Sequence, residues 1–309
     1  MSLEEIVKFT PEEVERLFNN PHARERTNFV ALAEKRIPLI AQIYGVSSEE
    51  VKKVISKWPQ FADYDHKRVV REAVEVYGIE NESKVKKSTL SFPPFAGLDH
   101  ERVIREAVEV YGIENESKVK KSTLSFPQFA DYDHKRVVRE AVEVYGIENE
   151  SKVKKSTLSF PPFAGLDHER VVREAVEVYG IENESKVKKA SLSFPQFAGY
   201  DHERVVRQMS RLGKIVGLEM EKVIEKILKT PALAGYSVKR YLAGLGVCRK
   251  LQNEGFENND YMLRAYFNNL GKSPYVPNSD RKRISQVENG EEPPLLTAMR
   301  KSLKYKLNQ

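Results

Sequence analysis

Hydrophobic residues in the middle of the chain recur with the period of an α-helix. After Asp65, the apolar positions that share one helical face are Val69, Val70, Ala73, Val74 and Tyr77. Asp65 is a favourable N-cap, and Gly78 favours the end of a helix. The pattern therefore predicts a helix between Asp65 and Gly78 whose apolar side is buried.

A second helix is predicted to follow the first one. Asn81 can cap its start, and Pro93 stops it because proline cannot continue the ladder of backbone hydrogen bonds. The residues expected on its inner face are Val85, Thr89 and Phe92. Phe95 is then expected to pack the short turn that leads to the next unit.

This helix pair recurs every 34 residues in four near-identical units, at 65–98, 99–132, 133–166 and 167–200. A period of this length is typical of solenoids, in which each unit buries its apolar face only against its neighbours. The units also alternate in pairs, as seen at Gln60, Pro94, Gln128, Pro162 and Gln196. We therefore expect an all-α superhelical solenoid, whether its uniformity arose by natural duplication or by deliberate consensus construction.

Diverged units extend the array on both sides. Residues 45–59 fit the second-helix pattern, with Ser47 and Glu50 able to form a capping box, and residues 223–240 fit it beyond the near-identical units. Pro21 and Pro274 fit the helix-stopping position of partial terminal units, which gives seven or eight units. The expected regions are a cap or partial repeat at 1–30, the array at 31–236, and a divergent repeat with a basic helical cap at 237–309.

A helix, then a second helix that ends in Phe-Pro and a following Phe or Leu, as in 119–129 and 223–233, resemble the repeats of the mitochondrial transcription termination factor (mTERF) family. The resemblance covers residues 31–236. It implies a superhelical solenoid that binds nucleic acid along a basic groove, commonly in organelle gene expression. Tetratricopeptide repeats share the 34-residue period, but their Trp-Leu-Gly-Tyr arrangement is missing. The activator-like DNA readers of plant pathogens also share it, but their Gly-Gly loop is missing.

The charge of +6 is unevenly distributed along the chain. Residues 1–64 carry −1, residues 65–200 carry −1, residues 201–236 carry +2 and residues 237–309 carry +6. A basic end on a solenoid suggests an acidic partner such as DNA or RNA, although a solvated tail gives the same count. The near-zero charge of 65–200 instead favours a protein-interaction scaffold.

Lysines recur on each predicted second helix, where those at the positions of Lys84 and Lys87 lie opposite the apolar face. Stacked repeats would place them in a ladder that can follow a phosphate backbone, although a solvated lysine face has the same pattern. With the basic C-terminal residues, the candidate binding residues are Lys84, Lys87, Lys118, Lys121, Lys152, Lys155, Lys186, Lys189, Arg240, Arg281, Lys282, Arg283, Arg300, Lys301 and Lys304.

Three other repeated features have a structural interpretation beside a functional one. Arg68 and Arg71 can pair with glutamates four residues on, although arginines at the position of Arg68 could also clamp phosphate. Histidines recur at the first turn of the first helix, and we expect them half-exposed rather than metal-binding: His66, His100, His134, His168 and His202. Variable residues on the inter-repeat turns, such as Tyr64, are expected to pack rather than to read bases.

The sequence offers no catalytic motif, so neither an enzymatic activity nor a cofactor or metal is expected. It has no phosphate-binding Gly-Lys-Ser/Thr loop and no His-Glu-x-x-His, and its lone Cys248 excludes an internal disulfide framework. No apolar run approaches the roughly 18 residues of a membrane span. We expect a monomer in a prokaryotic cytoplasm, or in an organelle if a transit peptide has been removed.

Overall fold

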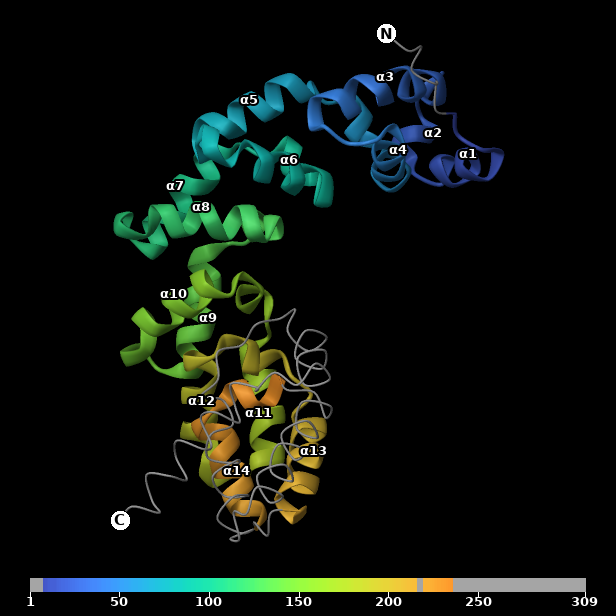
Figure 1. Ribbon diagram of the computed structural model, residues 1–309. Coiled ribbons are helices and arrows are strands. Elements are labelled where there is room, and N and C mark those ends of the chain that lie inside the picture. The colour runs from blue at the N-terminus through green and yellow to red at the C-terminus, as the bar shows by residue number, and fades with distance from the viewer. Residues whose placement is uncertain (1–7, 216–218, 236–309) are drawn as a thin grey trace, which may run out of the picture. The chain divides into compact units, whose positions relative to one another are not determined.

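The computed structural model describes residues 8–215 and 219–235, which form α-helices, short 3₁₀ helices and turns, with no β-strand among them (Figure 1). Helix pairs with a period of 34 residues follow one another along the chain. The predicted all-α repeat array is thus confirmed. The chain divides into two compact units, Met1–Gly165 and Leu166–Gln309, each of which is described by itself.

The first unit begins with four helices and continues with three of the near-identical pairs. Its α-helices are α1 (Pro11–Phe18), α2 (Pro21–Arg24), α3 (Phe29–Tyr44), α4 (Ser48–Lys57), α5 (His66–Tyr77), α6 (Glu82–Ser91), α7 (His100–Tyr111), α8 (Glu116–Ser125), α9 (His134–Tyr145) and α10 (Glu150–Ser159). The 3₁₀ helices between them are η1 (Pro59–Asp63), η2 (Ile79–Asn81), η3 (Pro93–Gly97), η4 (Ile113–Asn115), η5 (Pro127–Asp131), η6 (Ile147–Asn149) and η7 (Pro161–Gly165).

The described part of the second unit continues the same alternation of helices. Its α-helices are α11 (His168–Tyr179), α12 (Glu184–Ser193), α13 (His202–Ile215) and α14 (Met220–Lys229). Its 3₁₀ helices are η8 (Ile181–Asn183), η9 (Pro195–Gly199) and η10 (Pro231–Gly235). Within this unit α11 packs on α12 and α13, and α14 packs on α12 and α13.

The first helix of each repeat begins and ends as its sequence predicts. The Asp65 side chain caps α5 by accepting a hydrogen bond from the Arg68 backbone N–H at 3.1 Å. Gly78 ends the helix with φ of +92°, a conformation that favours glycine. The inner residues Val69, Ala73 and Tyr77 are buried. Binary patterning alone was thus sufficient to place this helix.

The start of the second helix differs from the prediction. A single 3₁₀ turn, η2, precedes α6, and Asn81 makes no side-chain capping bond. Its Nδ2 instead donates to the Tyr77 carbonyl oxygen at 2.8 Å, which satisfies the open end of the first helix. Asn81 therefore connects the two helices of one repeat rather than capping the second.

The second helix ends as predicted, at a proline. Phe92 is the C-cap of α6, and Pro93 occupies the first turn of η3, where a missing N–H costs nothing. Phe95, in the middle of η3, is fully buried, while Phe92 is only half-buried. Replacing a phenylalanine as buried as Phe95 by alanine typically costs about 3 to 5 kcal/mol.

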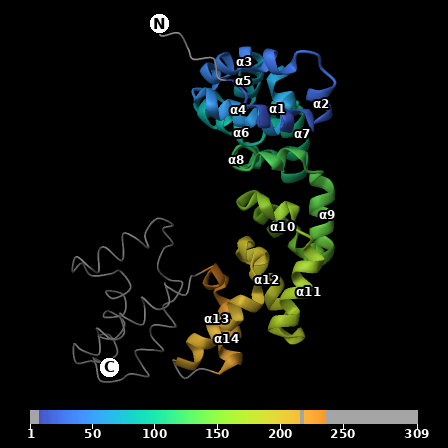
Figure 2. The same ribbon diagram turned by 90° about the vertical axis from the view of Figure 1, so that its right-hand side faces the viewer.

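Successive second helices of the first unit pack side by side, so that α8 lies between α6 and α10 (Figures 1 and 2). A buried hydrogen bond joins each neighbouring pair. Ser88 Oγ donates to the Leu124 carbonyl oxygen at 2.8 Å, and Ser122 Oγ donates to that of Leu158 at 2.7 Å. These serines lie on the inner side of the helix, where the sequence pattern gave no reason to expect a contact between repeats.

The N-terminal helices close one end of the array. Ser47 and Glu50 form the predicted capping box at the start of α4. Leu17, Phe29 and Ile37 are fully buried in the core that these helices share with α5. Pro21 begins α2 after α1 has ended at Phe18, which agrees with its predicted place after a helix end.

Candidate nucleic-acid interface

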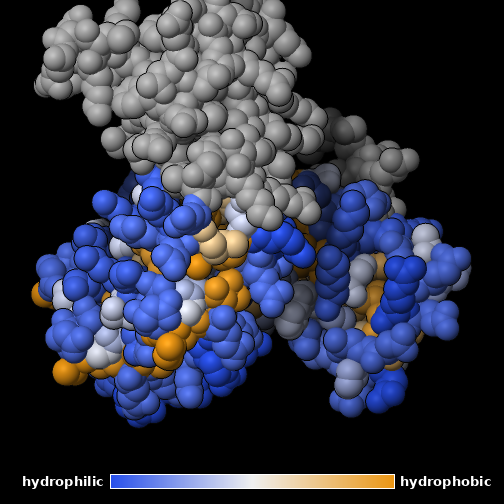
Figure 3. Space-filling view, turned by 90° about the horizontal axis from the view of Figure 1, so that it is seen from below, coloured by the Kyte–Doolittle hydropathy of each residue, from blue (hydrophilic) through white to orange (hydrophobic). Residues whose placement is uncertain are grey.

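The predicted lysines of the second helices are exposed in every repeat that the structure describes. They come from α6, α8, α10 and α12 and are Lys84, Lys87, Lys118, Lys121, Lys152, Lys155, Lys186 and Lys189. On the face shown in Figure 3, most described residues are hydrophilic and hydrophobic ones form separate patches. The cations are thus available to a ligand, and their neighbours determine which of them carry an uncompensated charge.

The three lysines of each second helix differ in their surroundings: the first two have a side-chain partner, and the third has no ionic one among the described residues. Lys84 Nζ donates to Asn81 Oδ1 at 2.9 Å, and the equivalent bond recurs at Lys118, Lys152 and Lys186. Lys86 pairs with Glu82 four residues earlier at 2.7 Å, as do its equivalents Lys120, Lys154 and Lys188 with their own glutamates. Within the described residues, the third lysine forms no ion pair in any repeat: Lys87, Lys121, Lys155 and Lys189. We call these four residues the unpaired-lysine set.

A groove of about 1270 Å³ runs between α8 and α10 in the first unit. It brings together Lys118 and Lys121 from α8 with Lys154 and Lys155 from α10. Serine hydroxyls lie beside these lysines, and the hydroxyls of Ser125 and Ser159 already donate to carbonyl oxygens of their own helix. The structure therefore gathers three of the predicted lysines, Lys118, Lys121 and Lys155, in one concave surface.

The same groove also contains four glutamates, so the number of charges alone does not make it basic. Two are paired: Glu109 with Lys135 at 3.4 Å and Glu150 with Lys154 at 2.7 Å. The other two accept hydrogen bonds from asparagine side chains, Glu114 from Asn115 at 3.0 Å and Glu148 from Asn149 at 2.9 Å. The acidic residues are thus held by local partners, whereas Lys121 and Lys155 have no ionic partner among the described residues.

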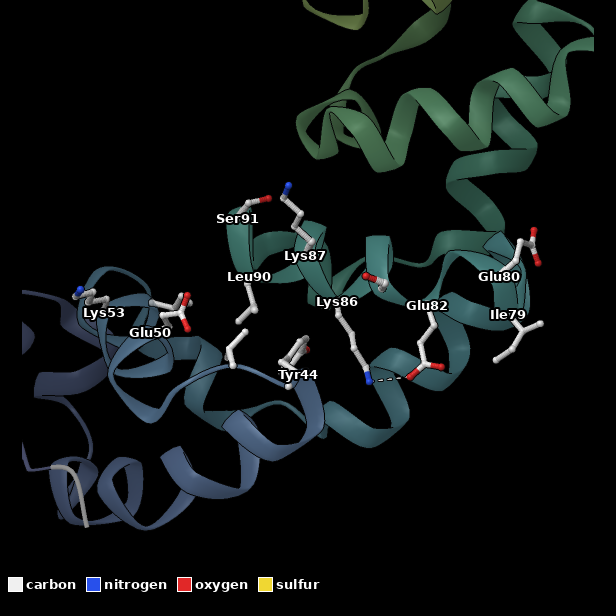
Figure 4. Close-up of a pocket in the computed structure, with 14 residues that line it drawn as sticks. Tyr44, Glu50, Lys53, Ile79, Glu80, Glu82, Lys86, Lys87, Leu90 and Ser91 are labelled. Atoms are coloured by element: carbon white, nitrogen blue, oxygen red, sulfur yellow. Dashed lines mark ion pairs between the residues drawn. The ribbon is translucent and has the colours of Figure 1, made fainter. Parts of the chain in front are cut away.

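A second groove, of about 920 Å³, lies between α4 and α6 (Figure 4). Lys86 and Leu90 point into it toward Tyr44, and Lys86 forms its ion pair with Glu82 there. Lys87 and Ser91 point away from Tyr44 in this view. The helix therefore presents its paired lysine toward the preceding repeat and its unpaired lysine in another direction.

The predicted arginine pairs of the first helices form in part. Arg68 lies 3.8 Å from Glu72, and the same i, i+4 pair recurs in α7, α9 and α11 at 3.7 to 3.9 Å. The second predicted pair is wrong: Arg71 and Glu75 have the same spacing but form no ion pair in the described structure. Arg68 and its equivalents are highly exposed, so their pairs contribute at most a few tenths of a kcal/mol.

The predicted basic residues of the C-terminal region lie outside the described residues. They are Arg240, Arg281, Lys282, Arg283, Arg300, Lys301 and Lys304. Pro274, predicted to stop a helix in a partial repeat, also lies there. The candidate interface therefore consists of the second-helix lysines.

The repeated histidines are buried, and the expectation that they would be half-exposed is wrong. Their exposed fractions range from 4% to 7%. In the second near-identical repeat, the His100 ring packs on Phe95 and its Nδ1 lies 3.4 Å from the hydroxyl of Tyr77, which belongs to the preceding repeat. Burial lowers the pKa of all five histidines to about 4, so they are neutral at pH 7. His100, His134 and His202 thus pack against aromatic rings of the preceding repeat.

The variable turn residues also have a packing role, in agreement with the interpretation from sequence. A Cβ added to Gly97 would lie 3.0 Å from the hydroxyl oxygen of Tyr64, one turn earlier. At Gly165 the corresponding distance to the hydroxyl oxygen of Tyr132 is 2.5 Å. Each tyrosine therefore needs a glycine on the following turn, which explains why the turns alternate in pairs.

Sequence reasoning missed one repeated surface feature. An isoleucine follows the glycine that ends each first helix, and it is 71% to 73% exposed at Ile79, Ile113, Ile147 and Ile181. Its position outside the helical apolar stripe was the available signal, because nothing in the periodic pattern buries it. We call these four residues the isoleucine set.

Comparisons of the chain with protein families, with curated proteins and with solved structures found no match. Among the described helices, none combines the length and the apolar character that crossing a membrane requires. The described residues also contain no group of three or more His, Cys, Asp or Glu side chains that could hold a metal ion. The function must therefore be argued from the repeated surface itself.

Proposed function

We propose that this chain is a non-catalytic nucleic-acid-binding protein, similar to the mTERF family, that contacts the phosphate backbone through its second-helix lysines and acts in gene expression. The observation that supports this most is the unpaired-lysine set. One lysine per repeat, at one fixed position, is exposed and has no ionic partner among the described residues. Unpaired cations that recur once per repeat can bind a nucleic acid, because its phosphates are also evenly spaced along the strand.

Their spacing agrees with contact to successive groups of phosphates. Packed helices lie about 8 to 10 Å apart, and B-DNA rises about 3.4 Å per phosphate along each strand. One repeat of the array therefore corresponds to about three phosphates. Phosphate contacts of this kind give affinity without reading sequence, since near-identical repeats present the same side chains at every step.

A salt titration of four substituted lysines tests this function. Two quadruple variants are compared, and both remove four positive charges. The first replaces the unpaired lysines: Lys87→Gln, Lys121→Gln, Lys155→Gln and Lys189→Gln. The second replaces the ion-paired lysines: Lys86→Gln, Lys120→Gln, Lys154→Gln and Lys188→Gln. Fluorescence anisotropy with labelled random-sequence DNA and RNA gives the affinity at several salt concentrations. Each phosphate contact contributes about 0.9 to the slope of log K against log salt for duplex DNA.

We expect the first variant to bind more weakly and, with duplex DNA, to lose about 3.6 from that slope, and the second variant to lose much less. Equal losses would show that only net charge matters, which would contradict a specific role of the unpaired lysines. If the unmodified protein binds no nucleic acid even at low salt, the proposal fails. The alternative is a protein-interaction scaffold, which the equal number of lysines and glutamates in the groove between α8 and α10 favours.

A further inference from the structure

The isoleucine set is the largest repeated apolar feature that the fold does not use. Ile79, Ile113 and Ile147 belong to the first unit and Ile181 to the second, and each is more than 70% exposed. A single exposed aliphatic residue is ordinary on a protein surface. Three at the same position of successive repeats instead give the first unit a periodic series of exposed apolar side chains, and Ile181 is equally exposed in the second unit.

One of these isoleucines lies in the same groove as the predicted lysines. Ile147 lines the groove between α8 and α10 together with Lys118, Lys121 and Lys155. Val110 and Leu158 add apolar surface to the same lining. A ligand in this groove thus meets lysines from both α8 and α10 and aliphatic side chains from the same two repeats.

The groove between α4 and α6 repeats this combination with different neighbours. Ile79 and Leu90 line it together with Lys53 and Lys87. Val46 and Val54 provide the apolar surface that comes from the preceding repeat. An isoleucine and an unpaired lysine of one repeat thus line the same groove in two places, but in the groove between α4 and α6 Lys87 points away from Tyr44 and Lys86, which points toward it, is paired with Glu82.

We propose, on the basis of the nucleic-acid binding proposed above, that the ligand is a single strand of DNA or RNA. Its phosphates contact the unpaired-lysine set, and its bases contact the isoleucine set. A single strand presents the flat apolar faces of its bases, whereas a duplex hides them in the stack. A duplex contacted only through its phosphates would leave the isoleucines in water.

The isoleucine and the unpaired lysine of one repeat lie on neighbouring elements. Ile147 is in η6 and Lys155 is in α10, and both line the groove between α8 and α10.

The test compares strand types and removes the isoleucines without changing charge. The full chain is titrated with labelled oligo-dT and oligo-U of about 20 nucleotides and with a duplex of equal length, at about 50 and about 200 mM salt. The same titrations are carried out on a variant that replaces the isoleucine set by serine: Ile79→Ser, Ile113→Ser, Ile147→Ser and Ile181→Ser. A matched control, Leu32→Ser with Leu39→Ser, removes exposed aliphatic side chains from α3 instead.

We expect the unmodified chain to bind a single strand at least about tenfold more tightly than the duplex. The isoleucine variant should lose about tenfold in single-strand affinity at both salt concentrations, with the slope of log K against log salt unchanged. The Leu32 and Leu39 control should bind as the unmodified chain does. Preference for DNA over RNA, or the reverse, would name the polymer without altering the proposal.

Other outcomes separate this inference from the function on which it rests. Equal binding of duplex and single strand, or full affinity of the isoleucine variant while the Lys87 variant is weakened, would overturn the single-strand inference and leave nucleic-acid binding intact. No binding of any strand type would contradict both. Thermal unfolding by circular dichroism shows whether the variant is folded, which we expect because all four side chains are exposed.

Discussion

The N-terminal joint between repeats has more polar contacts than the internal joints, whereas both kinds of joint have ring contacts at similar distances. A joint here is the contact among a first-helix tyrosine, the phenylalanine of the following turn and the histidine of the next repeat. In the N-terminal joint both ring nitrogens of His66 are bonded, Nδ1 to the Tyr44 hydroxyl at 3.0 Å and Nε2 to the Phe61 carbonyl oxygen at 2.8 Å.

The first internal joint has the same residue types but different contacts. Tyr77 lies 3.4 Å from His100 Nδ1, and His100 Nε2 has no hydrogen-bond partner within the described residues. The rings of Tyr77 and Phe95 stack at 28°, whereas those of Tyr44 and Phe61 are tilted at 41°. The internal joint thus has one buried hydrogen bond fewer and a more nearly parallel ring pair at the same centroid distance.

The aspartates of the corresponding turns also have more polar contacts at the N-terminal joint than at an internal joint. Asp63, in η1, is contacted by Arg26 and by His22 Nε2, the latter at 2.7 Å, and Arg36 lies 3.9 Å away. Asp131, in η5, forms no ion pair with a described residue, and partial burial raises the pKa of its carboxyl group. An end repeat has an identical neighbour on one side only, so polar side chains from the cap complete it.

Acid should produce the largest effect on these joints. All five histidines have a pKa of about 4 when folded, because of burial, against about 6.5 when unfolded. The unfolded chain therefore binds more protons between those values, and the free energy of unfolding falls as pH drops from about 6.5 to about 4. Each histidine should contribute on the order of 3 kcal/mol to that loss.

Urea unfolding followed by circular dichroism between pH 7.5 and pH 4.5 measures this loss. Replacing His100 and His134 by phenylalanine removes two of the titrating groups, so the variant should lose less stability over the same interval. An equal loss in both proteins would show that carboxyl groups, and not the internal histidines, determine the acid sensitivity.

The joints also show what the sequence could and could not predict. The 34-residue period and the helical apolar stripe were enough to predict the helix pairs, because both are local patterns. The burial of His100 depends on Tyr77 of the preceding repeat, a contact that no local pattern contains. Local spacing is also insufficient for ion pairs, since Arg68 pairs with Glu72 while Arg71 and Glu75, at equal spacing, do not.

The candidate site was predictable to a similar extent. The lysines were found because they repeat, but the partners of the first two and the lack of an ionic partner at the third were not predicted, although the Glu82 to Lys86 spacing could have suggested one pair. The exposed isoleucine was missed because apolar periodicity identifies what a helix buries and not what a turn exposes. Surface features of this kind depend on where the chain leaves the helix, and here that is set by the geometry at Gly78.

Two deletions of equal length should separate turn packing from the simple loss of a repeat. Removing residues 65–98 makes the turn that contains Asp131 follow the turn of Tyr64, in place of the turn that contains Gly97. The Asp131 side chain would then collide with the Tyr64 hydroxyl, which Gly97 avoids because it has no side chain. Removing residues 99–132 retains the pair of Tyr64 and Gly97 and brings Leu98 against Gly165. Steric overlap of this kind typically costs about 1 to 3 kcal/mol, so the first deletion should be the less stable.

Thermal unfolding of the two deletion proteins measures the difference. The two lost units are nearly identical in sequence, so the deletions are matched controls for each other. Adding Tyr64→Leu to the first deletion should recover most of the lost stability, because leucine carries no hydroxyl to collide. Equal stability of the two deletions would contradict the tyrosine and glycine pairing as the cause of the alternation.

The smallest effect should come from the aspartates themselves. Asp63→Asn removes the charge that Arg26 and Arg36 contact, and since these partners are partly exposed the loss should be about 1 kcal/mol. Asp131→Asn removes a carboxylate whose charged form is disfavoured by partial burial, so the free energy of unfolding should rise. The gain should be within about 0.5 kcal/mol, because more than a third of the residue is exposed. Urea unfolding at pH 7.5 compares the two variants directly. A loss of equal size in both would mean that Asp131 has a stabilising role of its own, and the internal joints would then depend on polar contacts as the N-terminal joint does.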